Sequence, residues 1–115
     1  MGDIQSMEKL PFLQFSMELR SGKIIEHDEG FLEILGYSEE EMETGEITLQ
    51  QFVPSVEYNE LTNQLRAEFL DKRYVSYRQE FVANNGNSFT VAAFYKIENK
   101  LLAGHRVIKV TASVV

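Results

Sequence analysis

Residues 21–42 constrain the fold of this chain more than any other segment. Ser21-Gly22 predicts a turn, and Ile24-Ile25 opens a short apolar strand directly after it. Asp28 then occupies the position of a helix N-cap, because its carboxylate can accept from backbone amides of the first turn. Apolar residues recur behind it at helical spacing, namely Phe31, Leu32, Ile34 and Leu35.

Gly36-Tyr37 predicts the end of this first helix, since glycine is the usual residue after a helix C-terminus. Ser38 starts a second helix at once. The run Ser38 to Glu41 fits a capping box, in which serine accepts from the third amide and Glu41 reaches back. A strand, a short helix, a glycine stop and a capped second helix in such close succession is an unusual order.

Five strands are predicted around this segment. Alternation of apolar and polar residues from Phe12 indicates a half-buried first strand, and Ile24 to His27 form the second. Three more follow residue 73: Tyr74–Ala83, Ser88–Ile97 and Leu101–Ser113, the last interrupted near Gly104. The tetrad 84–87, Asn-Asn-Gly-Asn, predicts a tight turn, and we expect another at Asn99-Lys100.

The remaining segments predict helices. Residues 3–9 form a short amphipathic helix, Thr48 to Gln51 fit another capping box, and Ser55 caps a longer helix after Pro54. An apolar stripe marks the longer helix: Tyr58, Leu61, Leu65 and Phe69. The expected fold is α+β, a five-stranded antiparallel sheet with helices covering one face, plus the short N-terminal helix.

Composition excludes several classes of function. The 115 residues suit one domain, and a net charge of −7 from 18 acidic and 11 basic side chains disfavours binding to nucleic acid. The absence of cysteine excludes disulfides, thiolate metal sites and cysteine nucleophiles. No apolar run approaches the roughly 20 residues of a membrane span. We expect a cytoplasmic protein, and the apolar end Val114-Val115 suggests that the parent chain continues.

These features together resemble the PAS sensory domain, a module of bacterial signalling proteins. The matching positions are Asp28, where the family often has Asn, and Pro54 before the long helix; the others are Phe31, Gly36, Tyr37, Ser38, Glu41 and Asn85-Gly86. The order of strands and helices is similar along essentially the whole chain. The resemblance implies a helical cap over residues 1–10 and a PAS domain over residues 11–115.

The departures from the family pattern concern its cofactors. Flavin-binding light sensors carry a cysteine motif after the Gly-Tyr-Ser helix, and residues 43–50 contain no cysteine. Haem-binding members use a histidine on the long helix, and Val56 to Leu70 contains none. FAD-binding members often use a tryptophan, which this chain lacks. The resemblance therefore implies no flavin or haem cofactor.

No catalytic or metal-binding constellation is predicted from the residues. His27 and His105 are the only histidines, and strand-end packing explains them better than metal ligation. Glu39 to Glu41 are consecutive on a helix, so they suit a solvated first turn rather than an acid/base pair. We therefore expect no enzyme activity from this domain by itself. One alternative is a small α+β enzyme with a cone-shaped pocket.

A ligand cavity is expected between the long helix and the sheet. Gln79 is its most informative residue, because it shares a strand face with the apolar Val75 and Phe81. A buried amide needs a partner, which is backbone, water or ligand. The expected ligand is small and neutral or weakly polar, and the candidate cavity residues are Met17, Ile34, Phe52, Leu65, Tyr77, Gln79, Phe81 and Val91.

A homodimer is expected on the outer face of the sheet, with Met7, Leu10 and Phe94 near its centre. The predicted function is a sensor or regulatory domain of a larger signalling protein, which binds a small ligand, mediates dimerisation, or does both. The family suggests a covalently linked output domain, first a diguanylate cyclase and next a histidine kinase. The other alternative is a ligand-free dimerisation module with a filled core.

Overall fold

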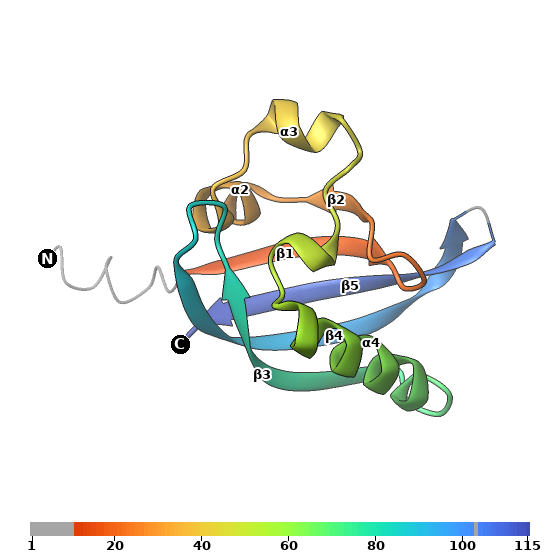
Figure 1. Cartoon of the computed structure of the whole chain (residues 1–115). Helices are drawn as coiled ribbons and strands as arrows, with labels where there is room; N and C mark the ends of the chain where they lie inside the picture. Colours follow the sequence, from red (N-terminus) through yellow and green to blue (C-terminus); the bar gives the residue numbers. More distant parts are fainter. Residues whose placement is uncertain (1–10, 103) are drawn as a thin grey trace, which may run out of the picture.

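A single five-stranded antiparallel sheet forms the scaffold of the computed structural model, which describes residues 11–102 and 104–115 (Figure 1). The strands are β1 (Phe12–Glu18), β2 (Ile24–His27), β3 (Tyr74–Val82), β4 (Ser88–Leu102) and β5 (His105–Val114). Their spatial order is β2-β1-β5-β4-β3, so the first and last strands of the chain lie side by side at the centre. The predicted sheet is confirmed.

Four helical segments join β2 to β3; the second of them buries no residue and stands away from the sheet, and the other three lie against one face of it (Figure 1). They are α2 (Glu29–Leu35), α3 (Glu39–Glu43), the 3-10 turn η1 (Leu49–Gln51) and α4 (Ser55–Glu68). Gly36 ends α2 in the left-handed conformation, at φ 79°, and its N–H donates to the carbonyl of Leu32. Glycine is needed there because this conformation is strained for side chains with a Cβ.

The core lies between the inner face of the sheet and the helices. Alternate residues of each strand point inward, and the register places Phe15 beside Val110 and Val110 beside Tyr95 across three neighbouring strands. The helices add buried side chains to the same cluster, namely Phe31, Leu35, Leu49, Phe52, Leu61 and Leu65. Aromatic rings pack edge to face at its centre, as with Phe31 and Phe52 at 5.6 Å.

Helix α2 approaches β1 unusually closely. A Cβ placed on Gly30 would lie 2.3 Å from the carbonyl oxygen of Phe12, a distance that atoms cannot adopt. The absence of a side chain at Gly30 therefore allows α2 to lie directly on the first strand, and this contact sets the position of the whole segment 28–44.

Two predicted boundaries are wrong. Asn99 and Lys100 do not form a turn: β4 continues through them to Leu102, with a register shift between Ile97 and Leu101, and the chain reverses beside Gly104. Pairing with β5 is present on both sides of these two residues, at Ile97 and at Leu101, so the strand runs through them as a bulge and does not reverse there. Ser55 does not cap the long helix either, because it lies inside α4 and Pro54 occupies the cap position. The predicted helix over residues 3–9 lies outside the described residues.

Candidate functional site

A hollow of about 230 Å³ separates the middle of α4 from β3 and is the best candidate for a ligand site. It lies where the sequence predicts a cavity, between the long helix and the sheet. Its lining comes from two elements, with Glu57, Glu60, Leu61 and Gln64 on α4 and Tyr77, Arg78 and Gln79 on β3.

Tyr77 brings an unused polar group to this hollow. Its hydroxyl is buried and has no hydrogen-bond partner among the described residues. Loss of contact with water raises the pKa of Tyr77, and the nearby carboxylate of Glu68 raises it further. A buried hydroxyl without a partner destabilises the fold, so this group is available to a ligand that can accept or donate a hydrogen bond.

Gln79 is held in place by a neighbour from β4. The hydroxyl of Tyr95, whose side chain is completely buried, donates a hydrogen bond to Oε1 of Gln79. Burial strongly raises the pKa of Tyr95, so this hydroxyl stays protonated and acts as the donor. Because Oε1 accepts, the amide orientation is set, and the Gln79 nitrogen has no partner among the described side chains. The partner of Gln79 is thus a side-chain hydroxyl, rather than the backbone, water or ligand expected from the sequence, and it occupies one half of the amide.

The rim of the hollow is acidic. Glu57 and Glu60 lie exposed on the first half of α4, and no lysine contributes to the lining. Arg78 also lines the hollow, although it is exposed and alternates with the inward-facing Tyr77 and Gln79, so two carboxylates stand against one positive charge. This charge distribution disfavours an anionic ligand and suits a neutral or positively charged one.

The structure separates the predicted cavity residues into three groups. Tyr77 and Gln79 line the hollow, whereas Ile34 is half-buried on α2. The other five are packed among one another in the core: Met17, Phe52, Leu65, Phe81 and Val91. A ligand thus meets the polar pair first and would displace core side chains to reach the remaining predicted residues.

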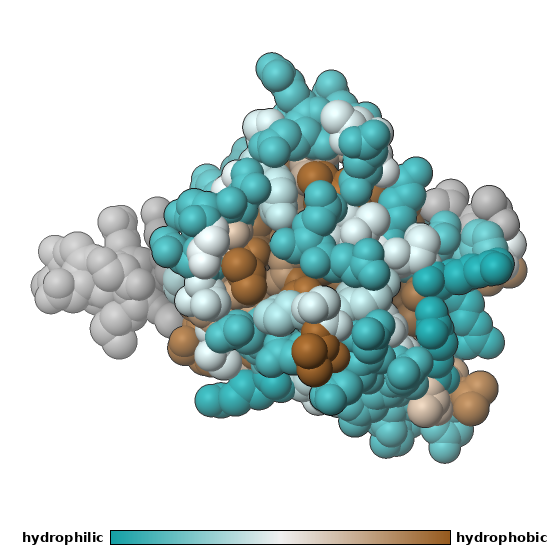
Figure 2. Space-filling view, viewed as in Figure 1, coloured by the Kyte–Doolittle hydropathy of each residue, from teal (hydrophilic) through white to brown (hydrophobic). Residues whose placement is uncertain are grey.

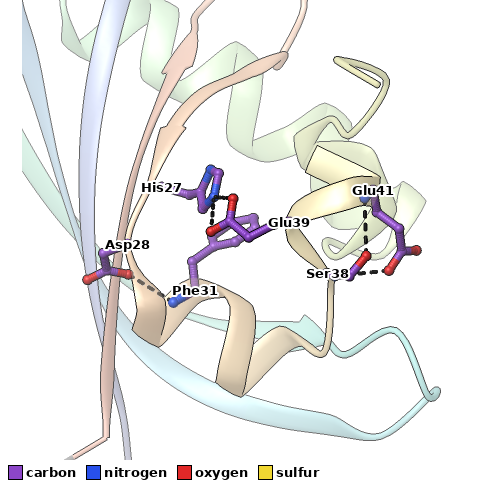
Figure 3. Close-up of polar contacts among 6 residues, drawn as sticks. All are labelled: His27, Asp28, Phe31, Ser38, Glu39 and Glu41. Atoms are coloured by element: carbon purple, nitrogen blue, oxygen red, sulfur yellow. Dashed lines mark hydrogen bonds and ion pairs between the residues drawn. The ribbon is translucent and has the colours of Figure 1, made fainter. Parts of the chain in front are cut away.

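Local hydrogen bonds stabilise the segment 21–42, which constrains the fold more than any other part of the sequence (Figure 3). Asp28 Oδ1 accepts from the backbone N–H of Phe31 at 2.8 Å, which caps α2. Ser38 Oγ accepts from the N–H of Glu41 at 3.1 Å, and the Glu41 carboxylate accepts from the N–H of Ser38 at 3.0 Å. Both predicted caps are confirmed, so this segment serves the architecture rather than a ligand.

His27 connects the end of β2 to the start of α3. Its Nε2 lies 3.4 Å from the carboxylate of Glu39, and its ring packs against Phe31 with the ring centroids 5.8 Å apart (Figure 3). This is strand-end packing, as predicted. Among residues 11–102 and 104–115, no group of three or more His, Asp or Glu side chains is arranged to hold a metal ion.

The outer face of the sheet carries three exposed aromatic side chains. Phe94 is 41% exposed and Tyr74 is 60% exposed, and their rings lie 5.4 Å apart; Phe12 on β1 is 52% exposed. Phe94 therefore lies on the outer face as predicted. The other two predicted interface residues, Met7 and Leu10, lie outside the described residues.

A larger hollow on the same outer face, of about 340 Å³, has a mixed charge. It lies over Ser16 and Lys109, and an ion pair of 3.5 Å between Lys100 and Glu26 spans its walls. Because its opposite charges pair with each other, it selects no ligand class.

No helix in the described part of the chain is both long and apolar enough to cross a membrane.

No protein-family model and no curated protein matches the sequence, but the structure is similar to solved PAS domains. The PAS domain of a protein from Colwellia psychrerythraea has a TM-score of 0.76 at 10% identity, covering 100% of this chain and 98% of that one. The PAS domain of an HTR-like protein from Haloarcula marismortui has a TM-score of 0.71 at 17% identity, covering 99% and 93%. A PAS domain from a two-component sensor histidine kinase has a TM-score of 0.69 at 12% identity, covering 99% and 94%. The likeness establishes the fold.

Proposed function

Because the chain has the PAS fold, we propose that it is a sensor or regulatory domain of a larger signalling protein and controls a covalently linked output domain. One observation carries this proposal: Tyr77, whose buried hydroxyl has no hydrogen-bond partner among the described residues, lines the hollow between α4 and β3 together with the oriented amide of Gln79. In a dimerisation module with a filled core, a buried polar group without a partner would only lower the stability of the fold.

The ligand that suits this hollow is small and neutral or positively charged. The Tyr77 hydroxyl and the Gln79 nitrogen both donate, so the ligand needs a hydrogen-bond acceptor at the sheet. A positively charged group would gain from Glu57 and Glu60 at the rim. The domain has no flavin or haem in this proposal, and it catalyses no reaction by itself.

A thermal-shift screen of small metabolites on the parent chain and on Tyr77→Phe tests the sensor function. A ligand that binds only the folded state stabilises it by about 2.7 kcal/mol at a hundredfold excess over its Kd. We expect stabilisation of the parent by a neutral or cationic ligand and a much smaller response of Tyr77→Phe. Tyr77→Phe removes one oxygen and leaves the packing intact, so it is a cleaner test than Gln79→Leu, which also deprives Tyr95 of its acceptor. A parent that responds to no ligand opposes the sensor function.

The output domain is proposed from the kind of protein in which similar folds occur. One of the similar PAS domains comes from a sensor histidine kinase, which favours a histidine kinase output over a diguanylate cyclase.

The signal would pass through β5, because this central strand contacts both β1 and β4 and leads toward the C-terminus (Figure 1).

The exposed aromatic group on the outer sheet face favours a second function, homodimerisation. Phe12, Tyr74 and Phe94 are large apolar side chains on a flat surface, and a second copy would cover them. We expect Phe94→Glu to shift the chain from dimer to monomer in light scattering. Leu70→Glu is the control, since Leu70 is 85% exposed in the turn after α4. A dimer that survives Phe94→Glu places the interface elsewhere.

A further inference from the structure

Three arginines from distant parts of the sequence meet at the end of the molecule where the β4–β5 turn lies. Arg20 follows β1, Arg66 lies in the last turn of α4, and Arg106 lies at the start of β5. Together with Leu19, Gly104 and His105 they line a hollow of about 300 Å³. This arginine hollow is separate from the ligand site between α4 and β3, with which it shares no residue.

One backbone hydrogen bond and one side-chain hydrogen bond bring these arginines together. The N–H of Leu19 donates to the carbonyl of Arg106 at 2.9 Å, which joins the end of β1 to the start of β5. The guanidinium of Arg66 donates to the carbonyl of Arg20 at 3.4 Å, which brings the helix to the same place. The pairing of β1 with β5 therefore brings Arg20 and Arg106 together, and the side chain of Arg66 joins them from α4.

The charge of the arginine hollow is uncompensated within the described residues. No acidic side chain lines it, and none of the ion pairs found in the described ranges uses Arg20, Arg66 or Arg106. The chain has 18 acidic side chains against 11 basic ones, so acidic partners are abundant elsewhere on the molecule. Positive charges gathered without a counter-charge repel one another, and a bound anion would remove that repulsion.

We propose that the arginine hollow binds the phosphate group of a small organic phosphate. Guanidinium groups donate pairs of parallel hydrogen bonds to phosphate oxygens, and several of them match its double charge better than that of a single carboxylate. The floor of the hollow is apolar, because Leu19 lies there almost fully buried. The phosphate would meet the arginines while the organic part of the ligand covers this floor.

The test is a titration of the full chain, followed by the backbone amide signals in two-dimensional NMR at constant ionic strength. Inorganic phosphate and phenyl phosphate are the probes, and sodium chloride is the blank. We expect saturable shifts near Arg20, Arg66 and Gly104 with both phosphates and none with chloride. Tighter binding of phenyl phosphate supports an organic phosphate, and equal affinity of the two supports a site for the phosphate group alone.

Charge variants decide whether the arginines form the site. Arg66→Gln and Arg106→Gln should each weaken phosphate binding by about tenfold or more. Arg66→Lys keeps the charge but loses the paired donors, so it should bind with intermediate affinity. Lys96→Gln removes one charge from the outer sheet face and should bind like the parent. All three substituted residues are exposed, so the variants keep the core intact.

Three results would overturn the proposal. The first is the absence of saturable binding of either phosphate, and the second is an equal loss of affinity in Lys96→Gln, which would indicate nonspecific attraction. The third is tighter binding of a polyglutamate peptide than of either phosphate, which would make the arginine hollow a contact surface for an acidic protein. Binding at Tyr77 concerns the separate hollow between α4 and β3, so a negative result there leaves the phosphate proposal unaffected, and the reverse also holds.

Discussion

The carboxylate of Asp28 accepts a hydrogen bond from the backbone N–H of Gln14 at 3.1 Å, across two strands of the sheet. The same oxygen, Oδ1, also accepts from the N–H of Phe31 at 2.8 Å. One side-chain atom therefore caps α2 and fastens the start of that helix to β1, so Asp28 stabilises both the local and the long-range structure.

Asp28→Ala should destabilise the fold more than an ordinary cap substitution. Removing an N-cap typically costs about 1 kcal/mol, and the lost bond to Gln14 adds roughly as much. Asp28→Asn keeps an acceptor oxygen and should remain close to the parent. Urea denaturation measures the difference, with Ser38→Ala as the control because Ser38 caps an exposed helix only. Equal losses in Asp28→Ala and Ser38→Ala would contradict the double role.

Gly30→Ala should destabilise the protein, although alanine is the better helix former. In an open helix this change gains about 0.5–1 kcal/mol. Here the new methyl group would lie 2.3 Å from the carbonyl oxygen of Phe12, so α2 must move away from β1. We expect a loss of about 1–3 kcal/mol, as for overpacked sites. Glu33→Ala on the exposed side of the same helix should change the stability by less than about 0.5 kcal/mol. A stabilised Gly30→Ala would refute the close approach.

Two tyrosine-to-phenylalanine changes should have opposite effects. Tyr77→Phe removes a buried hydroxyl that has no partner, so the free energy of unfolding should stay constant or rise by about 1 kcal/mol. Tyr95→Phe removes the donor to Gln79 and leaves its half-buried Oε1 without that partner, which should cost about 1 kcal/mol. Chemical denaturation of the two variants at neutral pH compares them directly. Similar losses in both would show that the Tyr77 hydroxyl does have a partner.

Stability should fall at high pH because of Tyr95. Burial raises the pKa of Tyr95 above its ordinary value of 10.0, so the folded state keeps a proton that the unfolded state releases. The contribution of protonated Tyr95 to the free energy of unfolding is complete below about pH 10. It is lost as the pH rises further, with a slope of about 1.4 kcal/mol per pH unit for one proton. Above that pH, the free energy of unfolding of Tyr95→Phe, measured by chemical denaturation, should fall less steeply with pH than that of the parent. The difference in slope should correspond to one proton. Parallel slopes would place the alkaline loss in Tyr37 or Tyr77, whose pKa values are also raised.

The purified chain should be colourless. It has no cysteine for a flavin adduct, no histidine on α4 and no tryptophan. An absorbance spectrum between the near-ultraviolet and the visible range checks this, with denatured protein as the reference for any released chromophore. Stoichiometric visible absorbance would overturn the proposal that the domain works without flavin or haem.

The sequence by itself determined those features whose causes are local. The caps at Asp28 and Ser38 depend on side chains that reach amides three residues away, so their pattern is readable in the chain. The alternation of β1 and β3 likewise reports which side chains are buried, because successive residues of a strand point to opposite faces. These local rules, combined with the order of the elements, were enough to predict the sheet and the helical layer.

Only the tertiary structure decided the features that depend on pairing between distant segments. Asn99 and Lys100 prefer a turn, yet β4 pairs with β5 on both sides of them, at Ile97 and at Leu101, and runs through them without reversing. The partner of Gln79 is Tyr95, which lies on the neighbouring strand and is set by the register of β3 and β4. The arginine hollow had no signal in the sequence, since residues 20, 66 and 106 share no motif or spacing. Their meeting follows from the pairing of β1 with β5 and from the position of α4, which are properties of the packed molecule.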